Sequence, residues 1–419
     1  MPPCRLCLLI SGVAISSIAS AQDVPQNVGV ADRSRPLYDP LAIRAGSVLI
    51  YPKLRSEVEY DDNVLASSSG GRGDKILTVE PDLRIRSDFN RHALDASLYY
   101  RRSLHAKLES EDVTEYGALA KGVVDVTRRT RIRLSGGSER AAENRRSLSS
   151  FSGSREPVRF GRYTGGAGLE QEFGRLTLSG GGEWRQLRYR DAVDQLGNPI
   201  DLRFRDLTVK TGIGQASYRL PSGVSLLLRG ALEQRDYALR PGDPGFDPIT
   251  NTDRSSRGAR IEGGVGLELT SLIYGTARIG YLKQNYRDPK LRDVSGLSYA
   301  VDLLWNVTPL TSLGLTGSKT IDESSSQITA GNLRTEVRAN IDHELLRNLI
   351  LSAGVRSARI SPAGPTAKSR EFEGEFSARY MMRRFLWLEA GYAHERRSSV
   401  DDRLDFRSNS VFLRVTLQR

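Results

Sequence analysis

The sequence predicts an all-β protein, a transmembrane antiparallel up-and-down β-barrel of about 18 strands, with 16 strands as the alternative count. Three observations support this prediction. Apolar and polar residues alternate from Ser47 to the C-terminus, which is the period of a strand with two different faces. Short and long links alternate between these segments. No apolar run in this region is long enough for a membrane helix.

The N-terminal residues 1–21 are predicted to be a secretory signal peptide. Arg5 precedes a largely apolar run from Leu6 to Ile18, and Ala19-Ser20-Ala21 provides a small-residue cleavage site. Residues 22–46 contain three prolines and no clear periodicity, so they are expected to form an extended periplasmic segment. Residues 47–419 are then left for the outer-membrane β-barrel.

The composition argues against a conventional soluble enzyme. Only 38% of the residues are hydrophobic and 40 are glycine, so little apolar material is available for a large dry core. Both cysteines, Cys4 and Cys7, lie within the signal peptide, which leaves no thiol for a disulfide or a metal site. A soluble β-sandwich or propeller is the alternative fold. The sparse, glycine-rich apolar face and the absence of a fixed repeat favour the barrel.

The number of strands is predicted from the links that join the alternating segments. Eight short links and nine long polar links alternate along the chain, which places all short turns at one rim and all long loops at the other. Strands of 12 to 15 residues are expected. Aromatic residues are expected to form interfacial girdles at both rims. They are Phe173, Tyr218, Tyr274, Trp305, Tyr380 and Phe385 near the turns, and Tyr60, Tyr100, Tyr116, Tyr163, Trp184, Phe204, Tyr237, Tyr286 and Phe406 near the loops.

One face of each predicted strand is apolar and suited to lipid, whereas the other is charged. The charged face is expected to line a water-filled lumen, because side chains alone do not fill a barrel of this width. An excess of basic groups on this wall would favour anions, while cross-strand Arg–Glu pairs that only stiffen the wall are the alternative role. The predicted lumen-lining residues are Lys53, Arg55, Glu57, Arg84, Arg86, Arg101, Arg131, Arg133, Arg185, Arg229, Arg334, Arg338, Glu373, Glu375 and Arg379.

Several short segments resemble a known family. The most specific is Tyr60-Asp61-Asp62-Asn63, and weaker matches include the turn from Asp125 to Thr130 and the closing segment from Ser408 to Leu413. On these segments the chain from residue 47 onward resembles the second family of putative beta-barrel porins, whose members are often associated with exopolysaccharide operons. The resemblance implies an outer-membrane barrel, and it transfers no catalytic residue.

No motif in the sequence predicts an enzyme, a cofactor or a metal site. The four histidines show no ligand spacing, and Ser298 lies in a strand pattern rather than in a nucleophile elbow. A membrane-embedded hydrolase built on Ser103 and His105 is a remote alternative. The Tyr60–Asn63 motif has two interpretations, a strand end that uses Asp and Asn to cap the backbone or a divalent-cation site, and the first is preferred.

The function that follows is a passive channel or export barrel in the outer membrane of a Gram-negative bacterium. Its cargo is expected to be hydrophilic solutes, and the family resemblance adds acidic exopolysaccharide. The alternative is a non-conducting structural barrel whose long loops, such as 141–157 with Arg145, Arg146 and Arg155, bind polysaccharide or lipopolysaccharide.

The expected partners are outer-membrane lipid, lipopolysaccharide and the barrel-assembly machinery, and no nucleic acid. The family resemblance adds exopolysaccharide export components. The chain departs from the usual pattern in one respect, since it ends Thr416-Leu417-Gln418-Arg419 rather than on the aromatic residue that the assembly machinery usually recognises.

Overall fold

The computed structural model describes residues 28–419 except 149, 152, 245, 247–251, 270–271, 323, 325–328, 330 and 365–366. The predicted signal peptide and residues 22–27 lie outside the described residues. Among the described residues, no helix is long and apolar enough to cross a membrane.

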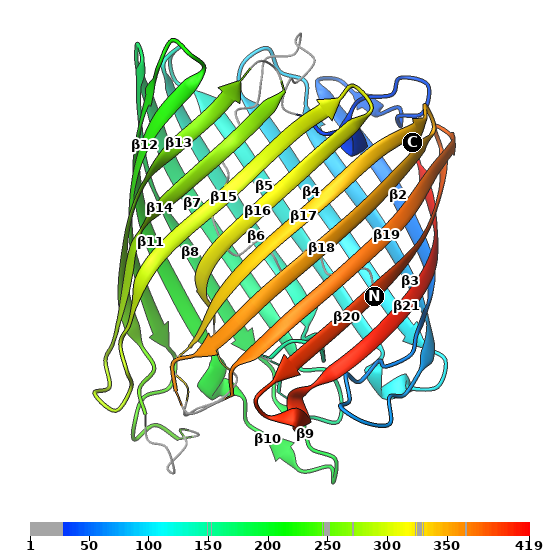
Figure 1. Cartoon of the computed structure of the whole chain (residues 1–419), viewed down its shortest axis with the longest axis vertical. Helices are drawn as coiled ribbons and strands as arrows, with labels where there is room; N and C mark the ends of the chain where they lie inside the picture. The colour runs from blue at the N-terminus through cyan, green and yellow to red at the C-terminus, as the bar shows by residue number, and fades with distance from the viewer. Residues whose placement is uncertain are drawn as a thin grey trace.

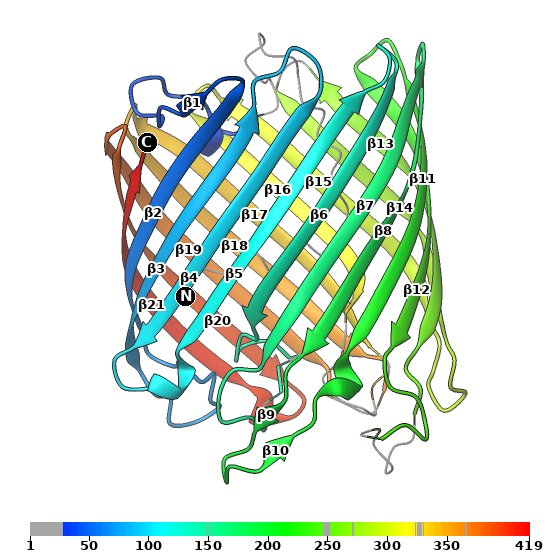
Figure 2. The ribbon, with the colours of Figure 1, turned by 180° about the vertical axis from the view of Figure 1, so that it is seen from behind.

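Eighteen long strands form one closed antiparallel sheet, in which each strand pairs with its neighbours in the chain and the last pairs with the first (Figures 1 and 2). The barrel strands are β2 (Val48–Asp61), β3 (Asp74–Ser87), β4 (Ala93–His105), β5 (Val113–Asp125), β6 (Thr130–Ala142), β7 (Arg159–Phe173), β8 (Leu176–Tyr189), β11 (Leu207–Arg219), β12 (Val224–Tyr237), β13 (Ser256–Leu269), β14 (Ile273–Tyr286), β15 (Val294–Thr308), β16 (Thr311–Asp322), β17 (Asn332–Leu346), β18 (Leu349–Pro362), β19 (Ser369–Arg383), β20 (Leu386–Ser399) and β21 (Phe406–Gln418). The predicted fold class and the count of 18 strands are confirmed, because the pairing of β2 with β21 leaves no open edge.

The smaller elements lie in the loops and at the N-terminus. They are the short strands β1 (Ile43–Ala45), β9 (Ala192–Val193) and β10 (Pro199–Ile200), and the one-turn 3-10 helices η1 (Val30–Asp32), η2 (Glu109–Glu111), η3 (Arg203–Arg205) and η4 (Asp402–Leu404). Strand β1 pairs with the first residues of β2, so the sheet begins four residues before the predicted start of the barrel at residue 47.

The connections alternate in length as the sequence predicts. Eight turns of two to five residues lie at one rim, and nine loops of six to eighteen residues lie at the other. We call these rims the turn rim and the loop rim. The turn between β7 and β8 shows why a short link is sufficient, since Gly174 has φ +64° and provides the left-handed conformation that a tight reversal needs. The strands are 12 to 15 residues long, as predicted.

The two faces of the sheet differ as the alternation predicts. On β2, Val58 and Tyr60 are about half exposed on the outer face, whereas Glu57 and Glu59, which alternate with them, are almost completely buried inside the barrel. The same parity continues to β21, where Leu413 is 55% exposed on the outer face. The apolar residues of this protein are therefore mostly outside and its ionised residues inside.

The predicted aromatic girdles form only in part. Most of the predicted residues, including Tyr60, Tyr100, Trp305 and Tyr380, are exposed large side chains on the outer face. Tyr237, Tyr274 and Phe406 are buried, so their assignment to a lipid-facing girdle is wrong. Each of them lies an odd number of positions from the outward residues of its strand and therefore points inward. Close to a strand end the alternation of apolar and polar residues is too short to show this.

Candidate functional site: the inner wall of the barrel

All fifteen predicted lumen-lining residues lie on the inner face of the sheet. Each either lies an even number of positions from a buried inner residue of the same strand or is the direct cross-strand partner of one. For example, Arg55 pairs with Glu80, Arg229 pairs with Glu262, and Glu373 pairs with Arg356. Some of these residues form networks of ion pairs, and others form no ion pair with a described residue.

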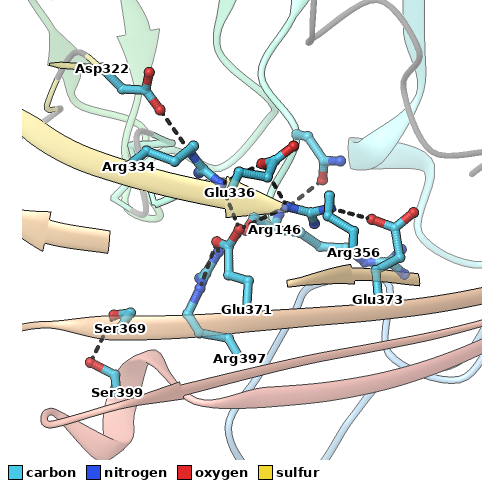
Figure 3. Close-up of polar contacts among 11 residues, drawn as sticks. Arg146, Asp322, Arg334, Glu336, Arg356, Ser369, Glu371, Glu373, Arg397 and Ser399 are labelled. Carbon is cyan, nitrogen blue, oxygen red and sulfur yellow. Dashed lines mark hydrogen bonds and ion pairs between the residues drawn. The ribbon is translucent and has the colours of Figure 1, made fainter. Parts of the chain in front are cut away.

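The densest network is centred on Glu371, which is 8% exposed on the inner face of β19 (Figure 3). Its carboxylate accepts hydrogen bonds from Arg334 at 3.0 Å, Arg356 at 3.3 Å and Arg397 at 3.0 Å. These arginines come from β17, β18 and β20, so one carboxylate joins the strands on both sides of β19 and one strand beyond them. Such a network is stable only while every member is paired, since each charge left alone would remain poorly hydrated.

Further pairs extend this network along the wall. Arg334 also binds Asp322 at 2.7 Å, and Arg356 binds Glu373 at 2.7 Å. Of the predicted lumen residues, Arg334 and Glu373 are thus brought into one cluster. Arg356, Glu371 and Arg397 complete it. None of these three is among the fifteen predicted residues, although their alternation with apolar residues is the available signal.

A second group of ion pairs lies where the barrel closes. Arg414 on β21 binds Glu57 on β2 at 2.6 Å and Glu389 on β20 at 3.0 Å. Arg379 binds the same Glu389 at 2.9 Å. Of these contacts, Arg414–Glu57 crosses the junction between the first and last strands, and the other two continue the group to β20 and β19.

Other predicted residues form smaller clusters. Arg101 binds Glu80 at 2.8 Å, and Arg55 binds the other oxygen of the same carboxylate. Two basic pairs share single acids, since Arg131 and Arg133 both bind Glu170, and Arg84 and Arg86 both approach Asp95.

Six cations on the inner face of the described strands have no carboxylate within ion-pair distance among the residues that the structure describes. They are Lys53, Lys121, Arg185, Arg219, Arg229 and Arg338. Acidic side chains are nevertheless at least as frequent as basic ones on the inner face of the described strands, with three each on β2, β3, β17 and β19. The expected excess of basic groups on this wall is therefore not seen, and local unpaired cations are seen instead.

The loop of residues 143–158 folds into the loop end of the lumen. Arg146, the fourth residue of this loop, is 8% exposed and donates to Glu395 at 2.6 Å and to Ser408 at 3.0 Å, and it also binds Asp61. Burial acts to lower the pKa of Arg146, but the carboxylates of Glu395 and Asp61 raise it above its usual value. The loop leaves between β6 and β7, so this contact with β2, β20 and β21 crosses part of the barrel interior (Figure 2).

Neighbouring loops hold the base of this segment. Arg145 binds Glu111 in the loop before β5 at 2.9 Å, and Glu143 binds Arg205 in the loop before β11 at 2.6 Å. In the alternative of a non-conducting barrel, Arg145 and Arg146 belong to a surface-binding loop. In the structure they are directed to protein carboxylates instead, and Arg155 alone of the three is exposed.

The motif Tyr60-Asp61-Asp62-Asn63 lies at the same place. Tyr60 faces outward, whereas Asp61 accepts a hydrogen bond from Ser408 at 2.6 Å in addition to Arg146. Asp62 accepts from the backbone and side chain of Asn409. Asn63 donates to the carbonyl of Arg407 at 3.0 Å. The motif thus joins the end of β2 to the start of β21, in agreement with a strand-end role.

The N-terminal segment occupies the turn end of the lumen. Val30 is completely buried against Ile350 and Met381, and its N–H donates to Ser312 at 2.9 Å. Arg35 forms a buried ion pair with Glu344 at 2.8 Å. The segment expected as an extended periplasmic lead-in is therefore, from residue 28 to about residue 39, packed against the inner wall of β15–β20.

The candidate nucleophiles have structural partners. Ser103 and His105 both face inward on β4, and they contact Thr78 at 3.0 Å and Asp112 at 3.3 Å rather than each other. Ser298 is completely buried and donates to Glu262 at 2.5 Å. No group of three or more His, Cys, Asp or Glu residues that could hold a metal ion occurs in the described part of the chain.

Comparisons with known proteins give the following matches. OccK2 (OpdF) of Pseudomonas aeruginosa, solved in complex with glucuronate, is 13% identical with a TM-score of 0.46, and the match covers 91% of this chain and 99% of that one. A BenF-like porin of Pseudomonas fluorescens Pf-5 is 13% identical with a TM-score of 0.45, covering 89% and 99% of the two chains. OccAB3 of Acinetobacter baumannii is 12% identical with a TM-score of 0.44, covering 89% and 99%.

No curated protein sequence matches this chain. The family comparison, in contrast, covers nearly all of the described residues. Residues 35–419, which contain every strand of the closed barrel, match the family described as "Putative beta-barrel porin 2", and this chain therefore belongs to that family of porin-like outer-membrane barrels.

Proposed function

We propose that this protein is a passive channel for hydrophilic solutes, and that acidic sugars of the exopolysaccharide class are among them. The observation that carries the proposal is the ionised inner face, which a closed barrel of 18 strands surrounds with more space than side chains fill. A wall of this kind favours water and dissolved solutes over apolar molecules.

The preference for acidic solutes is supported by the unpaired inner cations. Arg229 and Arg338 have no carboxylate within ion-pair distance among the described residues, so their guanidinium groups are available to a carboxylate in transit. Arginine suits this role because its planar fork binds carboxylates in two places, while a hydrated lumen keeps each contact weak enough to break.

A non-conducting barrel is the second candidate, and one observation favours it. The loop of residues 143–158 enters the lumen at one end, and residues 28–39 pack inside the other. In this alternative the barrel presents its loops to surface polysaccharide and carries no current.

Planar-bilayer conductance separates the two candidates. A steady ionic current through the reconstituted full chain is expected for the channel, whereas inserted barrels that carry no current would establish the alternative.

Liposome swelling then tests the preference for acidic solutes. We expect faster swelling with an acidic disaccharide than with a neutral one of the same size, and a smaller difference in Arg229→Gln/Arg338→Gln. The matched control is Arg257→Gln/Lys283→Gln, which removes the same charge from the outer face. Equal swelling rates for the two sugars in the wild type would refute the preference for acids.

A further inference from the structure

The positive charge of this chain is concentrated on the outer face next to the loop rim. Many outward positions in the strand ends next to the loop rim are basic. Examples are Lys75, Arg140, Arg188, Lys210, Arg257 and Lys283. The excess of 61 basic over 50 acidic residues is therefore displayed outside the barrel rather than inside it.

The strongest concentration is on four adjacent strands, β18–β21. Arg359 and Arg370 are direct cross-strand partners, and so are Arg396 and Arg407. All four side chains are exposed, and each lies on the outer face, as shown by the parity it shares with Val355, Phe372, Tyr392 or Val411. We call these four residues the arginine cluster.

The arginine cluster has no acidic partner in the described part of the chain. None of its members forms an ion pair or a side-chain hydrogen bond with any residue that the structure describes. Like charges placed directly opposite each other on a sheet are destabilising, and this chain has two such pairs side by side. An anion supplied from outside would remove the repulsion.

The surroundings of the cluster indicate what kind of anion fits. Directly toward the membrane centre lie the exposed apolar side chains of Phe372, Tyr392 and Val411, about 46%, 43% and 51% exposed. Arg396 is the cross-strand partner of Phe372 itself. A ligand that covers both surfaces has an apolar part next to a negatively charged head, which is the composition of a membrane lipid.

We propose that the arginine cluster binds the phosphate groups of lipopolysaccharide in the outer leaflet. The loop rim of an outer-membrane barrel faces the cell exterior, where phosphates lie at the upper edge of the apolar band. Guanidinium groups bind phosphate oxygens in pairs, and two facing arginine pairs offer several such donors. The acyl chains of the same molecule cover the apolar side chains beneath the cluster.

The proposal is tested by binding of the full chain, folded in a neutral detergent, to two preparations of lipopolysaccharide. One preparation is intact, and the other has had its lipid phosphates removed enzymatically. We expect clearly tighter binding of the intact form. Equal affinity for the two preparations would overturn the proposal without any variant, as would complete competition by inorganic phosphate at millimolar concentration.

The variant Arg370→Gln/Arg407→Gln removes one arginine from each facing pair. A basic residue near a charged lipid surface contributes roughly a factor of five in binding, so the affinity for intact lipopolysaccharide should fall roughly 25-fold. The control Arg128→Gln/Arg129→Gln removes the same charge from an exposed turn at the opposite rim. A loss of the same size in the control would refute the assignment to the cluster.

A stability measurement separates ligand binding from a structural role. In neutral detergent without anionic lipid, Arg370→Gln/Arg407→Gln should unfold at the same temperature as the wild type or at a higher one, because repulsion between like charges is relieved. Added intact lipopolysaccharide should raise the unfolding temperature of the wild type more than that of the variant. A variant that is less stable without lipid would show that the arginines serve the fold instead.

Discussion

The side chain of Arg146 anchors the first part of the loop of residues 143–158 in the lumen, and the backbone carbonyl of the same residue also accepts a hydrogen bond from Arg397. Arg146 reaches two carboxylates, Asp61 and Glu395, and the hydroxyl of Ser408. We expect Arg146→Ala to loosen this segment, because the hydrogen bond from Arg397 to the carbonyl of residue 146 remains but the two ion pairs are lost, while the loop base stays in place through Arg145 and Glu143. The result should be a wider and noisier channel.

The size of the effect follows from the burial of the contact. The side chain of Arg146 is 8% exposed and that of Asp61 is 3% exposed, so the substitution leaves a buried carboxylate without its counter-charge. Removing one partner of a buried ion pair costs roughly 3–5 kcal/mol, and water in the lumen favours the lower figure. About 3 kcal/mol is a factor of roughly 150 in the equilibrium between the anchored and the detached state of the segment around Arg146.

Single-channel recording in planar bilayers measures this change directly. The matched control is Arg155→Ala, which removes the same charge from the same loop at an exposed side chain. We expect higher conductance and more current fluctuation for Arg146→Ala and wild-type behaviour for Arg155→Ala. The reasoning fails if the two variants conduct alike, because the charge of the loop and not its anchoring would then set the current.

Three further predictions concern other contacts of the barrel. Glu344→Gln should release the N-terminal segment from the turn end and speed trypsin cleavage after Arg33, whereas breaking the exposed Arg44–Asp88 pair with Asp88→Asn should not; equal cleavage rates would contradict the buried anchor. Glu371→Gln should destabilise the barrel by roughly 3 kcal/mol and lower the temperature at which the folded band disappears on gels, and an unchanged temperature would show that the network adds nothing. Leu413→Arg should cost roughly 2–4 kcal/mol in lipid if this side chain faces acyl chains, as measured by equilibrium unfolding from vesicles, and a variant as stable as the wild type would place that face elsewhere.

The barrel itself could be predicted from the sequence because its determinants are local. A period of two residues fixes which side chains share a face, so the inner position of residues such as Arg55 and Arg229 follows from their immediate neighbours. The lengths of the connections fix how many strands there are and which rim each link occupies. These features need no knowledge of distant contacts.

The contents of the barrel could not be predicted in the same way. Arg146 binds Asp61, 85 positions before it, and Glu395, 249 positions after it. Arg35 finds Glu344 across 309 positions. A pattern in the sequence shows that these residues are charged, but it does not show which charges meet, because closing the barrel is what brings them within reach.

The sequence alone thus determined the two faces of the sheet, the strand count and the division into short turns and long loops, since each depends on residues two to twenty positions apart. The tertiary structure alone decided that the loop at Arg146 and the N-terminal segment at Arg35 enter the lumen. It also decided that four outward arginines from β18–β21 face each other in pairs. The physical reason is that a buried charge is stable only beside an opposite charge. In a closed barrel that opposite charge can come from any strand lining the same enclosed space, however far away it is in the sequence.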